Sequence, residues 1–92
     1  MSRQQMTVYY SGRVQGVGFR YTVKLLTPGF EVTGTIRNLE DGRVELVAVG
    51  ERAELDAFRQ AVRESGLGRM IAREEDFFAP ASGSFRGFEI VS

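Results

Sequence analysis

The sequence has no cysteine, no histidine and no tryptophan, and only two prolines among its 92 residues. Without cysteine there is no disulfide, no thiolate nucleophile and no cysteine-ligated metal. Without histidine the chain lacks the most common general base and the most common zinc ligand. Any chemistry that the protein performs must therefore use other groups.

An excess of charge is also missing, because 12 Lys and Arg residues balance 12 Asp and Glu residues. Strong binding of nucleic acid needs clustered positive charge to neutralise phosphates, so we expect no nucleic-acid partner. No run approaches the roughly 18 apolar residues that cross a bilayer, and no apolar secretory segment follows residues 1–5. We therefore expect no membrane partner, a cytoplasmic location and a flexible N-terminal tail over residues 1–5.

The residues that are present favour one domain spanning 1–92, because a 42% hydrophobic content is enough for a modest core. Apolar residues recur with a helical period in 19–26 and 53–64, and five segments have strand-like composition: 6–12, 31–38, 43–49, 70–78 and 85–91. The order β-α-β-β-α-β, with an additional short strand near the end, predicts an α+β ferredoxin-like fold. We expect an antiparallel sheet of four to five strands with two helices on one face.

Three glycines interrupt the chain between the first strand and the first helix, at Gly12, Gly16 and Gly18. Glycine tolerates positive φ, so the backbone can curl until successive N–H groups form an anion-binding nest. The nest would open into a helix N-terminus, which favours a phosphate, and Arg20 adds a guanidinium. The competing interpretation is a plain connector whose Arg20 makes an ordinary surface ion pair.

Two motifs now stand out. Residues 12–20 read Gly-Arg-Val-Gln-Gly-Val-Gly-Phe-Arg, and residues 34–44 contain Gly-x-x-x-Asn-x-x-x-Gly-x-Val. Both motifs, at this separation, resemble the two signatures of the acylphosphatase family, and the resemblance extends over almost the whole chain. The sequence departs from the family at Tyr10, usually aliphatic, and at Thr35, usually a large aromatic residue.

The resemblance implies a hydrolase that cleaves small acyl phosphates to a carboxylate and inorganic phosphate, without metal or cofactor. It implies that Arg20 binds the phosphate and that Asn38 orients the attacking water. The implied phosphate cradle consists of backbone N–H groups of Gln15, Gly16, Val17, Gly18, Phe19 and Arg20. Inorganic phosphate or sulfate should bind at the same site. Because the second helix has no obvious apolar patch, we expect a monomer.

Several alternatives remain open. The scaffold could be a non-enzymatic module that binds an anion or a protein, as in larger hydrogenase-maturation proteins, and Asn38 could simply end a strand. Aromatic residues near Arg13 and Arg20 could indicate RNA stacking, although the RNA-reading signature of this fold is absent; these are Tyr9, Tyr10, Phe19 and Tyr21. The acidic run 74–76 could suggest a metal site, but we expect a solvated face.

Overall fold

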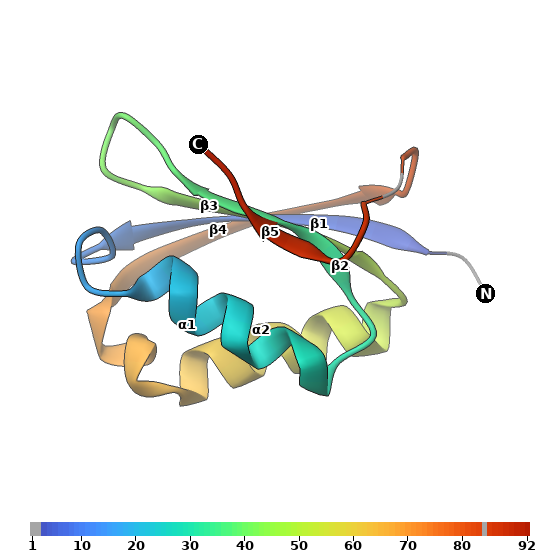
Figure 1. Ribbon diagram of the computed structural model, residues 1–92, viewed down its shortest axis with the longest axis horizontal. Coiled ribbons are helices and arrows are strands. Elements are labelled where there is room, and N and C mark those ends of the chain that lie inside the picture. The colour runs from blue at the N-terminus through green and yellow to red at the C-terminus, as the bar shows by residue number, and fades with distance from the viewer. Residues whose placement is uncertain (1–2, 84) are drawn as a thin grey trace.

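The computed structural model describes residues 3–83 and 85–92, and it consists of one five-stranded sheet covered on one face by two helices (Figure 1). The elements, in chain order, are β1 (Gln4–Gly12), α1 (Phe19–Leu26), η1 (Thr27–Gly29), β2 (Thr33–Asn38), β3 (Val44–Gly50), α2 (Arg52–Glu64), η2 (Gly66–Met70), β4 (Ile71–Pro80) and β5 (Phe88–Ile90). The predicted ferredoxin-like order of elements is confirmed. None of the helices described is both long and apolar enough to span a membrane.

The strands lie in the order β4-β1-β3-β2-β5, and the sheet is mixed rather than wholly antiparallel. Strands β1 to β4 pair antiparallel, but β5 pairs parallel with β2, with Gly34 opposite Phe88. The expectation of a fully antiparallel sheet is therefore wrong at one edge. The chain leaves β4 at one edge of the sheet and returns beside β2 at the other, where β2 already runs in the direction that β5 takes.

The expectation of a flexible tail over residues 1–5 is wrong for Gln4 and Gln5. Gln4 and Gln5 belong to β1 and pair with Gly50 and Val49 of β3 and with Pro80 and Ala79 of β4. The polar side chains of these two residues do not indicate a strand in the sequence. Backbone pairing with a strand on each side nevertheless keeps them in the sheet. Residues 1 and 2 lie outside the described residues.

The core lies between the helices and one face of the sheet, as the two-residue and three-to-four-residue periods predict. Met6, Val8 and Tyr10 alternate along β1 and are fully buried. Opposite them, α1 contributes Phe19 and Val23, and α2 contributes Leu55, Phe58 and Val62. This layer fixes α1 against the sheet and so determines where the loop before it can lie.

Candidate active site

The loop between β1 and α1 is held at both ends. At its start a side chain on Gly12 would clash with the backbone of β4, and the Arg13 N–H donates to the Met70 carbonyl at 3.0 Å. Val14 is buried in the core, and at the other end Phe19 packs on Tyr10 with ring centroids 5.1 Å apart. The residues between these anchors must therefore arch over the end of the sheet.

Two glycines give the arch its curvature. Gly16 and Gly18 have φ of 76° and 79°, in the left-handed region that residues with a side chain rarely adopt. Nothing lies within 4 Å of the place where a Cβ would sit at either residue, so backbone conformation rather than space requires glycine. Left-handed residues alternating with ordinary ones point successive N–H groups into one concavity. Within the described residues, no N–H from 15 to 18 donates a hydrogen bond to another backbone group.

Helix α1 adds its own N-terminus to this concavity. Gly18 is the N-cap residue, its carbonyl accepts from the Thr22 N–H at 3.0 Å, and no side chain caps the helix. The first turn also contains no acidic residue. The first N–H groups of the helix and the positive end of its dipole are thus left without a negative partner.

Arg20 lies at this helix end, half-buried, and forms no ion pair with any residue in the described part of the chain. The alternative in which Arg20 serves an ordinary surface ion pair therefore has no support. A hollow of about 160 Å³ opens here; its lining residues are Val14, Gly16, Gly18, Phe19, Arg20, Tyr21 and Ile90. The structure thus places Gly16 and Gly18 of the loop and Arg20 around one space, whereas Gln15 and Val17 do not line it.

Asn38 is the last residue of β2 and is half-buried. It does not line the hollow, but its Oδ1 atom is buried and has no hydrogen-bond partner among the described residues. The turn that follows is closed by hydrogen bonds from the Gly42 N–H to the Leu39 carbonyl at 3.2 Å and from the Leu39 N–H to the Arg43 carbonyl at 2.8 Å, and the Asp41 carboxylate accepts from the Arg43 N–H at 3.1 Å. The Asn38 side chain does not shape the hairpin, so the strand-ending interpretation leaves its buried oxygen unexplained.

The Gln15 side chain connects the two motifs. Its Nε2 atom donates to the carbonyl oxygen of Leu39 at 2.8 Å and to that of Arg43 at 3.0 Å. These carbonyls belong to the base of the hairpin that follows Asn38. Sequence reasoning included only the Gln15 backbone, because nothing in a lone glutamine indicates acceptors 24 and 28 residues away.

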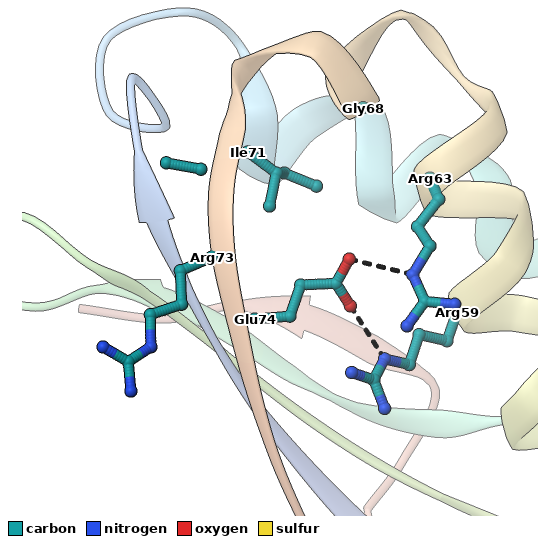
Figure 2. A pocket seen from close by; sticks show the side chains of 7 residues that line it. Arg59, Arg63, Gly68, Ile71, Arg73 and Glu74 are labelled. Carbon is teal, nitrogen blue, oxygen red and sulfur yellow. Dashed lines mark hydrogen bonds and ion pairs between the residues drawn. The ribbon is translucent and has the colours of Figure 1, made fainter.

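A second and larger hollow, of about 450 Å³, lies between α2, η2 and β4 (Figure 2). The Glu74 carboxylate there accepts from Arg59 Nε and from Arg63 Nε, each at 2.9 Å. Burial favours the neutral acid, but hydrogen bonds from Arg63 and Arg59 outweigh it and hold the pKa of Glu74 below its ordinary value. Arg59 and Arg63 are therefore already paired with a carboxylate of the protein.

The expected solvated face over 74–76 is wrong for Glu74, whose side chain is only 14% exposed. Register explains the difference, because Glu74 lies opposite Tyr10 on β1 and so shares the face of the sheet that α2 covers. Asp76, on the same face, also binds Arg59. Within residues 3–83 and 85–92, no group of three or more acidic side chains is arranged to hold a metal ion.

The aromatic residues that suggested RNA stacking do not form a platform. Tyr10 and Phe19 are in the core, only 0% and 2% exposed, so they cannot stack on bases. Tyr9 lies on the opposite face of the sheet, where the Arg43 guanidinium stacks over it at 4.6 Å and Phe77 meets it edge-on. Tyr21 is exposed, but it stands alone beside Arg20 at the smaller hollow.

Comparison with known proteins agrees with this geometry, since the acylphosphatase family model matches residues 6–90. The chain belongs to the acylphosphatase family. An acylphosphatase of Archaeoglobus fulgidus is 47% identical over 94% of this chain and 96% of its own length. The crystal structure of acylphosphatase from Bacillus subtilis superposes with a TM-score of 0.88 at 31% identity, covering 97% of this chain and 99% of that one.

These relatives confirm the predicted family, the fold and the class of enzyme, a hydrolase of acyl phosphates. The acylphosphatase fold also occurs inside a larger protein. HypF from T. kodakarensis contains a region that superposes on 97% of this chain with a TM-score of 0.82 and 28% identity, and this region is 12% of the HypF chain.

Proposed function

We propose that the hollow between residues 14–20 and β5 binds the phosphoryl group of an acyl phosphate, and that Arg20 and Asn38 carry out its hydrolysis. The observation that carries the proposal is Arg20, which has no ion-pair partner among the described residues, beside a loop whose glycines curl the backbone around one space. Arg20 and backbone N–H donors surround this space, and no carboxylate from the described part of the chain lines it. Such a set of groups is complementary to a tetrahedral oxyanion.

The chemistry needs little more than this. In phosphoryl transfer the negative charge spreads over the equatorial oxygens, so positioning and electrostatic stabilisation supply most of the catalysis. Arg20 and the amides of 15–20 hold those oxygens. The bond between phosphorus and the bridging oxygen breaks and a carboxylate departs, a leaving group that needs no general acid. The absence of histidine is therefore no obstacle to the reaction.

Asn38 would orient the nucleophile. Its buried Oδ1 has no protein partner among the described residues, so it is available to accept a hydrogen bond from a water molecule. Held in this way, the water oxygen attacks phosphorus opposite the departing carboxylate, and its proton passes to the phosphate. Fixing the water in line converts a loosely placed nucleophile into a near-attack arrangement.

The proposal is tested by release of inorganic phosphate from benzoyl phosphate by the purified protein. Arg20→Ala should remove most of the activity and most of the inhibition by inorganic phosphate while the protein stays folded by circular dichroism. Arg73→Ala is the matched control, because it also removes an arginine, but an exposed one on β4 that pairs, within the described residues, only with Glu75 at 3.6 Å. Equal losses in both variants would contradict the assigned role of Arg20.

The region of HypF that shares this fold motivates a second candidate, an anion-binding module without turnover. The same assay separates the two functions. Phosphate binding that depends on Arg20, with no release of phosphate from any acyl phosphate, would favour the module over the enzyme.

A further inference from the structure

We propose that the Gln15 side chain is a positioning residue, which fixes the distance between the phosphate cradle and Asn38. The inference rests on the proposed function, because it concerns how two parts of that site are kept in register. The cradle belongs to the β1–α1 loop, whereas Asn38 belongs to the end of β2. Nothing in the covalent chain sets the separation of these two segments closely.

Gln15 bridges them with both hydrogens of a single amide. Its two acceptors, the carbonyls of Leu39 and Arg43, lie at the base of the β2–β3 hairpin, and Leu39 directly follows Asn38 in the chain. Each carbonyl also accepts a hydrogen bond within the hairpin, from Gly42 and from Leu39 respectively. The amide thus joins the loop to carbonyls that already take part in the backbone hydrogen bonds of the hairpin.

A role in general stability explains this contact poorly. Gln15 is exposed and contributes nothing to the core, and the loop is already anchored by Val14 and Phe19, which are buried on either side of it. Within the described part of the chain, no other side chain of residues 13–18 forms a hydrogen bond or an ion pair with the rest of the protein. The two bonds of Gln15 are therefore specific to the register between cradle and hairpin.

The expected consequence is a separation of binding from turnover. The cradle amides are held by Gly16 and Gly18 and by helix α1, so they persist when the Gln15 amide is removed. The in-line placement of a water held by Asn38 depends on where the hairpin lies relative to the cradle. Because a displacement of about 1 Å can cost about a hundredfold in rate, loss of the bridge should lower kcat while phosphate still binds.

The test uses Gln15→Met, which keeps the length of the side chain and removes both donors, and Gln15→Asn, which keeps the amide one methylene too short. Gln60→Met is the matched control, since Gln60 is an exposed glutamine on α2 whose Nε2 donates to Glu64 at 3.2 Å. With benzoyl phosphate we expect Gln15→Met to lower kcat about 10- to 100-fold. KM and the inhibition constant of phosphate should change less than about threefold, and Gln60→Met should match the wild type.

A double-mutant cycle with Asn38→Ala distinguishes positioning from a general defect. If Gln15 acts through Asn38, Gln15→Met should have little further effect in the Asn38→Ala background, because the water is already unplaced. An equal fold-loss in both backgrounds, a wild-type kcat in Gln15→Met, or a loss confined to phosphate affinity would overturn the inference. Failure of the wild-type protein to release phosphate would instead overturn the proposed function.

Discussion

The two hollows described above both have arginine in their lining, but they differ in whether acidic side chains pair with those arginines. In the larger one, Arg59 and Arg63 converge on Glu74 (Figure 2), and Arg59 also binds Asp76. In the smaller one, Arg20 has no acidic partner among the described residues and lies beside open backbone amides. The proposed active site is thus the smaller of these two hollows. An arginine that the fold has already paired with carboxylates has little charge left for a ligand, whereas an arginine without an acidic partner is a candidate for binding one.

The most direct test of this comparison replaces the guanidinium of Arg20 by an ammonium group. Arg20→Lys should lower kcat/KM for benzoyl phosphate by about a thousandfold or more, because a point charge cannot replace the bidentate guanidinium grip on the transferring phosphoryl group. Thermal unfolding should be nearly unchanged, since Arg20 pairs with nothing within the described residues. Near wild-type turnover in Arg20→Lys would end the assignment of the smaller hollow as the active site.

A smaller loss is expected when the charge at the water-holding position changes. Asn38→Asp should reduce kcat about a hundredfold, because a carboxylate there repels the phosphate and alters the placement of the water. Asn38→Ala should also lower kcat in steady-state assays, because it removes the amide that places the water, but it adds no repulsion of the phosphate. A variant with aspartate that hydrolyses benzoyl phosphate normally would exclude Asn38 as the water holder.

In the larger hollow we expect a substitution to lower stability and to leave turnover unchanged. Glu74→Gln leaves two largely paired arginines without their shared carboxylate, so we expect the free energy of unfolding to fall by about 1–3 kcal/mol in urea denaturation at pH 7. The kcat of the folded variant should equal that of the wild type. A large loss of turnover without a loss of stability would mean that this cluster belongs to the active site.

The same variant has a defined pH dependence. The pKa of Glu74 is lowered in the folded protein from an ordinary value of 4.5, so its stabilising contribution is complete above that value and is lost as the pH falls through the lower, folded value. The stability difference between wild type and Glu74→Gln should therefore shrink below about pH 4.5, as measured by urea denaturation from pH 6 to pH 3. A difference that stays constant over that range would show that the carboxylate charge is not what stabilises the cluster.

The same contrast shows what the sequence could reveal. Helix α1 begins and ends where the helical period over 19–26 predicted, because this signal is local. The glycines of the cradle were equally readable, since positive φ demands glycine whatever surrounds it. Local signals of this kind predicted most of the fold and the loop of the proposed phosphate cradle.

Long-range pairings escaped prediction. The burial of Glu74 depends on its register opposite Tyr10, and an acidic run reads as solvated until that register is known. The parallel pairing of β5 and the reach of Gln15 to the β2–β3 hairpin likewise depend on which segments meet in space. A single sequence indicates such long-range contacts only through known motifs, which is why the sequence named Arg20 and Asn38 as candidates and gave no indication of a role for the Gln15 side chain.

Tyr10 lies between the proposed cradle and the Glu74 cluster, and its substitution should have the smallest effect of those considered. Its ring packs on Phe19 beside the proposed cradle. Its hydroxyl group is buried, has no hydrogen-bond partner among the described residues and lies near the charge of Glu74. Burial raises the pKa of this phenol well above its ordinary value. A hydroxyl that has lost water and gained no hydrogen bond contributes an unfavourable desolvation free energy.

Tyr10→Phe keeps the ring and should leave stability unchanged or raise it by up to about 1 kcal/mol, with kcat unaltered. A fall in the thermal unfolding midpoint of Tyr10→Phe would show instead that the hydroxyl makes a stabilising bond, and a fall in kcat alone would extend the active site to the edge of the arginine cluster.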